Sequence, residues 1–384
     1  MSEPSAGHPI RVVVVDDSPS ICRLITAYLR SSPGFEVIGT ALNGRAGLEM
    51  VKKLHPDVVT LDLEMPELNG LETLEQIMYD CPTPVVVVSG VSRQAAATTI
   101  QAINHGAVDF VLKYTPGVDM DADALRQEII AKVRTASQIK VIRSLRVASA
   151  QKAAAPDLHA RAESGRAESG RGETAQATPA SPAARATSSF VGGGVIVIGA
   201  STGGPVALRE LLSGLPASFP AALIIIQHMP ASFTGVLAAQ LDQRISLKVK
   251  EAASGDRLAA GLVLVAPGGY HLLLRPDSRV ELVPGAEVGG HRPSIDVTMQ
   301  SVAQIYGART RGVLLTGMGS DGALGMVAIH AKGGQTYAQD ADSCVINGMP
   351  QRAIDKGVVD YIAPPTQIAQ LLRLAYSSRM KDKS

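Results

Sequence analysis

Short apolar runs alternate with amphipathic segments five times between Ile10 and Ser137, and this alternation limits the possible folds more than any other feature. Strands and helices that alternate with short connections predict a parallel sheet covered by helices on both faces, an α/β fold. The polar residues at the carboxyl ends of such strands gather into one site. The expected strands are Arg11–Val15, Glu36–Ala41, Val58–Leu61, Val85–Val88 and Asp109–Leu112, and the expected helices begin near Ser20, Gly44, Leu71, Ala95 and Asp121.

The ends of these strands carry a set of charged and polar residues: Asp16, Asp17, Asp62, Ser89 and Lys113. Three carboxylates placed together repel one another unless a hard cation such as Mg²⁺ lies among them. A hydroxyl and an ammonium opposite them suit a phosphoryl group carried on one carboxylate. The alternative is that Asp16 and Asp17 only cap the following helix, which explains one aspartate but not the whole set.

Length and composition predict two domains joined by a linker. The 384 residues exceed the usual size of one domain. Between 149 and 189 the chain consists mainly of Ala, Ser, Gly, Pro, Arg and Glu, with the pentapeptide Arg-Ala-Glu-Ser-Gly repeated. Such a segment lacks the large apolar side chains that a core needs. We therefore expect one domain over 10–137, a flexible linker over 138–189 and a second domain over 190–384.

The charge and the cysteine content argue against several classes of protein. A formal net charge of +1 gives no electrostatic reason to bind nucleic acid or an anionic membrane. Three widely separated cysteines, Cys22, Cys81 and Cys344, lack metal-ligand spacing and suit a reducing compartment. No apolar run approaches the roughly 20 residues that span a bilayer, so we expect a cytoplasmic protein without membrane insertion.

The segment VIVIGASTGGPVALRELL, at 195–212, places a serine in a glycine-rich turn between a buried strand and a helix. Ser201 fits the pattern G-x-S-x-G, in which a sharp turn exposes the hydroxyl to a substrate. The alternative is a phosphate-binding loop of a nucleotide-dependent enzyme, since helix N-termini also bind anions. That alternative is weaker because the Walker and dinucleotide glycine patterns are both absent.

A serine nucleophile needs a base and a third group that orients the base. His228 follows the apolar run AALIIIQ, and Asp321 lies in a glycine-rich turn beyond the run RGVLLTG. Three parallel strands would bring Ser201, His228 and Asp321 to one sheet edge, which predicts a catalytic triad. His291 with Asp296 is a competing pair, although the glycines before it predict a loop. The order Ser, His, Asp differs from the order Ser, acid, His of α/β-hydrolases.

The first block resembles the receiver domain of two-component response regulators in the segments VVVVDDS, LDLEMPELNGLETL, VVVVSG and GAVDFVLK. The resemblance implies a flavodoxin-like domain with a five-stranded parallel sheet, in which Asp62 accepts the phosphoryl group. It implies that Mg²⁺ is held by Asp16, Asp17, Asp62 and the backbone carbonyl of Glu64. The implied switch residues are Ser89, Phe110 and Lys113. Receivers usually have proline directly after the lysine, whereas this chain has Tyr114.

The second block resembles the CheB family, the chemotaxis protein-glutamate methylesterases, in the segments IGASTGGP, QHMPASFT, APGGYHLLL, HRPSIDVTMQSVA, LLTGMGSDGALGM and YAQDADSCVINGMPQRAI. A receiver and a linker precede this domain in the family as well. The resemblance implies a doubly wound α/β domain with Ser201 as nucleophile, His228 as general base and Asp321 as the orienting group. Our candidates for holding the oxyanion are the backbone amides of Thr202 and Met318.

The same resemblance implies that the substrates are γ-glutamyl methyl esters of methyl-accepting chemoreceptors. Methanol leaves from an acyl-enzyme that water then hydrolyses, and receptor glutamines are expected to be deamidated in the same way. Hydrolysis is expected to need no cofactor. A chemotaxis histidine kinase is expected to supply the phosphoryl group, and the protein is expected to be recruited to chemoreceptor arrays. A different class stays open, namely a phosphorylation-dependent receptor-binding regulator with a weakly active or inactive esterase domain. A DNA-binding output is disfavoured because the second block has strands and no basic patch.

Overall fold

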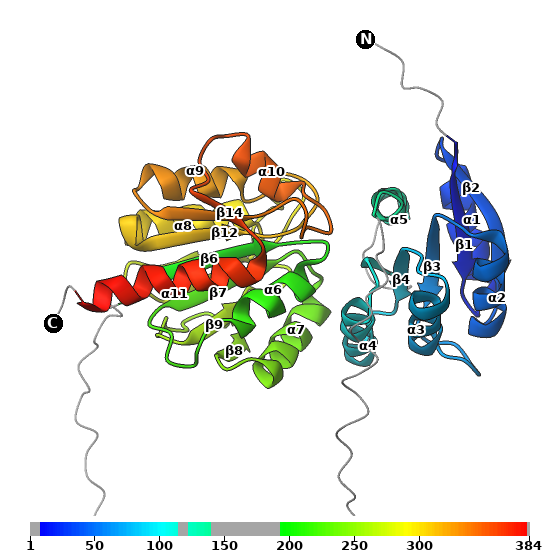
Figure 1. The fold of residues 1–384 in the computed structure, drawn as a ribbon, viewed down its shortest axis with the longest axis horizontal. Coiled ribbons are helices and arrows are strands. Elements are labelled where there is room, and N and C mark those ends of the chain that lie inside the picture. Colours follow the sequence, from blue (N-terminus) through cyan, green and yellow to red (C-terminus); the bar gives the residue numbers. More distant parts are fainter. Residues whose placement is uncertain (1–7, 114–121, 140–192, 382–384) are drawn as a thin grey trace, which may run out of the picture.

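The computed structural model describes residues 8–113, 122–139 and 193–381, which form two α/β domains (Figure 1). Tyr114 and the part of the expected linker beyond Ile139 lie outside the described residues. Among the helices that are described, none combines the length and the apolar character needed to cross a membrane.

The N-terminal domain is a five-stranded parallel sheet, as predicted, and the strand order is β2-β1-β3-β4-β5. Helices α1 and α5 pack on one face, and α2, α3 and α4 on the other. The chain adds β2 on one side of β1 and β3 on its other side, so the strand order reverses between β1 and β3, the position where such sheets bind ligands. The strands are β1 (Ile10–Val15), β2 (Phe35–Ala41), β3 (Val58–Asp62), β4 (Val85–Ser89) and β5 (Asp109–Leu112), and the helices are α1 (Pro19–Arg30), α2 (Gly44–Leu54), α3 (Gly70–Asp80), α4 (Arg93–Asn104) and α5 (Ala122–Ala136).

Polar residues shortly after the strands determine where the first four helices begin. Each of four side chains accepts a hydrogen bond from the backbone amide three residues further on: Ser18, Asn43, Asn69 and Ser92. This contact satisfies one of the amides that the first turn of a helix leaves unpaired. All five helices begin within two residues of the expected positions.

The C-terminal domain is built on a seven-stranded parallel sheet in the order β14-β13-β12-β6-β7-β9-β8. Helices α8, α9 and α10 cover one face and α6, α7 and α11 the other (Figure 1). An antiparallel hairpin of β10 and β11 stands apart from the sheet. The strands are β6 (Val195–Ala200), β7 (Ala222–Gln227), β8 (Lys248–Glu251), β9 (Leu262–Val265), β10 (His271–Leu274), β11 (Val280–Val283), β12 (Thr310–Leu314), β13 (Gln335–Gln339) and β14 (Tyr361–Ala363).

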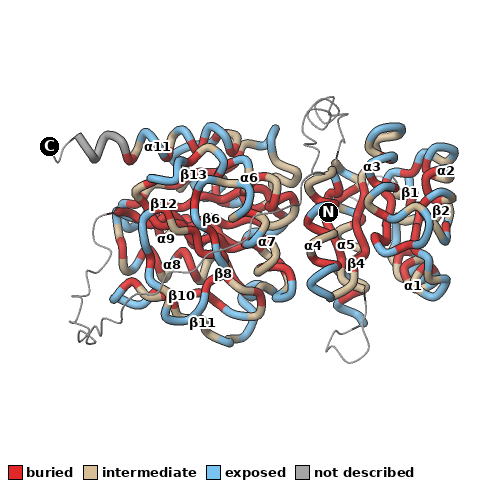
Figure 2. Tube along the Cα trace, turned by 90° about the horizontal axis from the view of Figure 1, so that it is seen from below, coloured by how far each residue is buried: buried red, intermediate tan, exposed pale blue. Residues whose placement is uncertain are grey.

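The helices of this domain are α6 (Gly204–Ser213), α7 (Ala231–Arg244), α8 (Ile295–Tyr306), α9 (Ala323–Ala331), α10 (Met349–Ile354) and α11 (Pro365–Lys381), with a short 3₁₀ turn at Gly307–Arg309. Strands β6 and β7 are buried along their whole length. A strand covered on both faces reads as a continuous apolar run, which is why neither segment alternates in sequence. Figure 2 shows that buried residues lie along the central strands of both domains, for example β6 and β4.

The two domains contact each other through α4 and β5 on one side and α6 and α7 on the other. Phe110 on β5 stacks on Phe233 of α7, with ring centroids 4.7 Å apart and planes 8° apart. Arg209 Nη1 on α6 donates a hydrogen bond to Asn104 Oδ1 on α4 at 2.6 Å. The carboxyl edge of the second sheet, where α6 and α7 begin, therefore lies next to the first domain.

The close approach of α3 to the end of β3 generates a stability prediction. A Cβ on Gly70 would overlap the backbone oxygen of Asp62 and lie 2.5 Å from Leu63 Cα. We expect Gly70→Ala to lower the free energy of unfolding of the N-terminal domain by about 1–3 kcal/mol, the usual effect of overpacking. Gly90→Ala is the control, because a Cβ there would meet only Ala95 Cβ at 3.6 Å. Equal thermal unfolding midpoints for the two variants would contradict this prediction.

Candidate active site

Ser201 and His228 directly follow neighbouring strands of the second sheet. The register of β6 with β7 pairs Ala200 with Gln227, so the next residue of each strand lies at the same sheet edge. The His228 amide donates to the Ala200 carbonyl at 3.1 Å, and the Ser201 amide donates to the carbonyl of Thr316 at 3.0 Å. Thr316 follows β12, so three strand ends meet where the strand order reverses, the usual ligand position in such sheets.

The turn that carries Ser201 depends on glycine. Gly203 has φ +77°, a left-handed conformation that residues with a Cβ rarely adopt. A Cβ on Gly204 would overlap Gln227 Oε1, and the Gly204 amide donates to the Ser201 carbonyl at 2.7 Å. Pro205 lies in the first turn of α6. The predicted sharp turn is present, and it leaves Ser201 only partly buried.

Asp321 is a buried carboxylate held by many donors. It accepts hydrogen bonds of 2.7 to 3.1 Å from one hydroxyl and three backbone amides, those of Ser294, Ile295, Asp296 and Gly322. His228 Nε2 lies 2.8 Å from Asp321 Oδ2. Burial alone would raise the pKa of the Asp321 carboxyl, but the bonds from His228 and the amides lower it to about 2. Asp321 therefore stays ionised beside the imidazole at neutral pH.

The imidazole of His228 uses only one nitrogen in this arrangement. With Nε2 bound to Asp321, the buried Nδ1 has no hydrogen-bond partner among the described residues. If Nε2 carries the proton that faces the carboxylate, Nδ1 is the proton acceptor. The ring of His291 stacks on that of His228, with centroids 3.7 Å apart and planes 9° apart.

The competing pair of His291 and Asp296 does not form. The Asp296 carboxylate accepts a hydrogen bond from the Gly325 amide at 2.6 Å, because Asp296 lies in the first turn of α8 and points toward the start of α9. His291 is a loop residue, as expected, and its ring contacts His228 instead.

The backbone amides of Thr202 and Met318 lie in the two loops that adjoin Ser201. Gly317 approaches the nucleophile loop so closely that a Cβ on it would lie 2.7 Å from Ser201 Cβ. Within the described ranges, neither the Thr202 amide nor the Met318 amide donates a hydrogen bond. Unused amides beside a hydroxyl are the donors that an oxyanion requires.

The acidic residues of the first domain gather as predicted. Carboxylate oxygens of Asp16, Asp17 and Asp62 lie within 4.8 Å of one another, an all-oxygen set that suits Mg²⁺. Lys113 Nζ lies 2.9 Å from Asp16 Oδ2 and 2.7 Å from Asp62 Oδ2. Burial raises the pKa of Asp62, although Lys113 acts in the opposite direction. The Glu64 amide donates to Asp62 Oδ1 at 3.1 Å, which holds the Glu64 backbone at this cluster.

The remaining switch candidates lie on β4 and β5. Thr99 on α4 donates its hydroxyl to Ser89 Oγ at 2.6 Å, and the Lys113 amide donates to the Ser89 carbonyl at 2.7 Å. Phe110 lies away from the carboxylates, in the interface with Phe233. Strand β5 therefore connects the acidic cluster at its end with the domain interface at its start.

A polar contact links the first domain to the residue after Ser201. The Thr202 hydroxyl donates a short hydrogen bond to Asp109 Oδ2 at the start of β5. Asp109 also pairs with Lys132 Nζ of α5 at 3.3 Å, and that ammonium lies 4.9 Å from the centre of the Phe110 ring. Asp109 and Lys132 were not predicted as site residues, because their only signal in the sequence is an aspartate at the start of an apolar strand.

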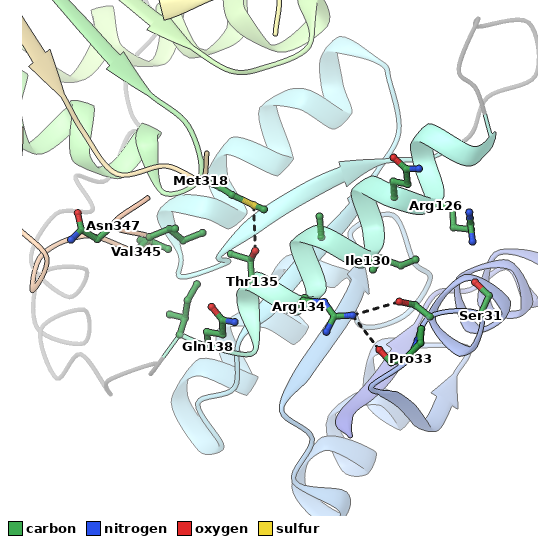
Figure 3. Close-up of a pocket in the computed structure, with 15 residues that line it drawn as sticks. Ser31, Pro33, Arg126, Ile130, Arg134, Thr135, Gln138, Met318, Val345 and Asn347 are labelled. Atoms are coloured by element: carbon green, nitrogen blue, oxygen red, sulfur yellow. Dashed lines mark hydrogen bonds between the residues drawn. The ribbon is translucent and has the colours of Figure 1, made fainter. Parts of the chain in front are cut away.

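A cleft of about 770 Å³ lies between α5 and the loops that carry Met318 and Val345 (Figure 3). Thr135 on α5 donates its hydroxyl to Met318 Sδ at 3.5 Å. The domains thus pack directly at α4, whereas at α5 the contact of Thr135 with Met318 lies in this cleft.

Two family models match separate parts of this chain. The CheB methylesterase family model matches residues 196–372, and the response regulator receiver domain model matches residues 12–129. The protein-glutamate methylesterase/protein-glutamine glutaminase of Symbiobacterium thermophilum is 42% identical over 370 residues, covering 96% of this chain and 97% of that protein. The protein of the same name from Pyrococcus horikoshii is 38% identical, covering 96% and 94%. The crystal structure of the Thermotoga maritima CheB methylesterase catalytic domain aligns with 40% identity and a TM-score of 0.46, covering 47% of this chain and 98% of that one.

The lowered pKa of Asp321 generates a prediction about acid stability. The ionised carboxylate adds to the free energy of unfolding. This contribution is complete above pH 3.8, the ordinary pKa of the group, and is lost as pH falls toward the folded-state pKa of about 2, because the unfolded chain binds the proton first. We expect Asp321→Asn to lack this component and to be destabilised at all pH values, because an amide cannot accept every bond that the carboxylate accepts. The control is Asp355→Asn, an exposed carboxylate that meets Gln351.

Thermal unfolding midpoints between pH 2 and pH 6 measure this difference. A midpoint that falls equally with acid in Asp321→Asn and in the wild type would show that Asp321 is not the group responsible.

Proposed function

Because this chain belongs to the CheB methylesterase family, we propose that it is a phosphorylation-regulated hydrolase of γ-glutamyl methyl esters on chemoreceptors. Receptor glutamines are its second class of substrate, deamidated through the same acyl chemistry. The observation that supports this proposal best is the partly exposed Ser201 at the sheet edge next to His228, whose Nε2 lies 2.8 Å from an ionised Asp321.

In the proposed reaction Ser201 Oγ attacks the ester carbonyl carbon while its proton passes to Nδ1 of His228. Asp321 stabilises the imidazolium and keeps its orientation. The amides of Thr202 and Met318 donate to the oxyanion. Methanol leaves with the proton from His228, and the same base then activates water, which hydrolyses the acyl-enzyme and restores both the glutamate and Ser201. With a glutamine substrate, ammonia is the leaving group.

In the first domain we assign Asp62 as the phosphoacceptor. Asp16, Asp17, Asp62 and the Glu64 carbonyl would hold Mg²⁺, which neutralises charge on the incoming phosphoryl oxygens. Lys113, already paired with two of these carboxylates, would contact the phosphoryl group. A histidine kinase of the chemotaxis pathway is the proposed phosphodonor, and chemoreceptor arrays are the proposed place of action.

Regulation follows from the position of the first domain against the edge that carries Ser201. Lys113 at the end of β5 contacts Asp62, whereas Phe110 and Asp109 of the same strand contact Phe233 and Thr202 of the second domain. A change at Asp62 can therefore reach the interface along one strand. We propose that phosphorylation shifts a docking equilibrium and that the docked state has the lower hydrolytic rate.

The nucleophile assignment predicts the effect of one substitution. We expect Ser201→Ala to lower methanol release from methylated receptor membranes by about 10⁴-fold or more, as when one member of a triad is removed. Ser213→Ala, on the exposed end of α6, is the control and should keep the wild-type rate. Ordinary turnover by Ser201→Ala would contradict the assignment, whereas a wild-type protein without turnover would favour the receptor-binding regulator.

The regulatory proposal predicts how the first domain alters the rate. We expect removal of residues 1–189 to raise esterase activity above that of the unphosphorylated full chain. Asp62→Asn should keep the basal rate and lose stimulation by a small phosphodonor with Mg²⁺. Chelation of Mg²⁺ should likewise remove the stimulation and spare the basal rate, because hydrolysis does not use the metal. If truncation gave no gain and the phosphodonor no stimulation, the first domain would not restrain the esterase.

A further inference from the structure

The imidazole of His228 is anchored at only one of its nitrogens. Nε2 is bound to Asp321, and Nδ1 has no partner among the described residues. One hydrogen bond fixes one point of the ring but does not fix its plane. The lone pair of Nδ1 lies in that plane, so efficient proton transfer from Ser201 depends on the plane being held.

The ring of His291 supplies the missing constraint. It lies parallel to the His228 ring, 3.7 Å away between centroids and 9° away in plane. This separation is close to van der Waals contact, so rotation of the His228 ring about its bond to Asp321 would drive its edge into the His291 ring.

His291 is itself held relative to Asp321. It exchanges two backbone hydrogen bonds of 3.1 Å with Val288, and the next carbonyl, that of Arg292, accepts from Gly269 at 3.0 Å. The Ser294 hydroxyl, three residues after His291, donates to Asp321 Oδ1 at 2.9 Å. The segment that carries the His291 ring therefore also holds Asp321, the anchor of His228.

The charge state of His291 suits this role. Burial lowers its pKa to about 4, and His228 acts in the same direction, while Asp321 opposes them. The nearest cationic side chain along the loop, Arg292, donates instead to the Gly285 carbonyl at 2.5 Å. At neutral pH His291 thus presents an uncharged aromatic face to His228, and such a face attracts the cation that forms when His228 takes up a proton.

We propose that His291 is a positioning residue of the hydrolysis, which keeps the His228 ring in the plane required for proton transfer and favours its protonated form during turnover. This inference rests on the proposed function of His228 as the general base. The feature that matters is a flat aromatic ring, so phenylalanine should replace His291 and an aliphatic side chain should not.

The test compares His291→Phe with His291→Leu in the full chain, with methanol release from methylated receptor membranes as the assay. We expect the leucine variant to lose about 10–100-fold in kcat with KM within about twofold, the scale of a misplaced catalytic group. The phenylalanine variant should retain kcat within about threefold, because its π face replaces that of imidazole. If the leucine variant unfolds early, His291→Gln replaces it, with the same expected loss.

Two results would overturn this inference: unchanged kcat in the leucine or glutamine variant, or a phenylalanine variant as slow as the leucine variant. Both are read against an active wild type and an inactive Ser201→Ala. Turnover by Ser201→Ala, or an inactive wild type, would instead overturn the proposed function.

Discussion

The hydrogen bonding of β6 to β7 and β12 at their carboxyl ends is the constraint on which the candidate site depends. The Ser201 amide donates a hydrogen bond to the Thr316 carbonyl at 3.0 Å, and the His228 amide donates one to the Ala200 carbonyl at 3.1 Å. Because all three strands are parallel and buried, these ends cannot shift without unpairing the sheet. The loops beyond the ends then need only short paths to bring Asp321, Thr202 and Met318 to the same edge.

The two domains meet at the same edge, and this contact is the basis of the proposed regulation. Strand β5 is only four residues long, yet the start of the strand contacts the second domain and the residue after its end contacts Asp62. Asp109 accepts a hydrogen bond from the side chain of Thr202, whose amide is a candidate oxyanion donor. We therefore propose that docking acts on the loop that carries Ser201 as well as on access to it. Within the described residues the side-chain contacts of Asp62 are with Lys113 and Glu64 of its own domain, so we propose that the short strand couples the acidic cluster to the esterase.

Much of the fold and of the site could be predicted from sequence because each depends on local signals. Apolar runs marked the strands of the first sheet to within one residue, and the position of Ser201 and His228 after such runs predicted their shared edge. The contacts of Asp109 with Thr202 and of His291 with His228 join residues 93 and 63 positions apart, through domain docking and a loop path that no local pattern encodes. For the same reason the rival pair of His291 and Asp296 looked plausible in sequence but is separated in the structure.

The claim that docking restrains hydrolysis is tested most directly by hydrogen exchange measured alongside the rate of hydrolysis. Backbone amides at the facing surfaces of α4, α6 and α7 should exchange faster when a small phosphodonor and Mg²⁺ are added, because undocking exposes them. We expect this loss of protection and the rise in methanol release to follow the same dependence on phosphodonor concentration. A rise in hydrolysis with unchanged protection of α6 and α7 would contradict it.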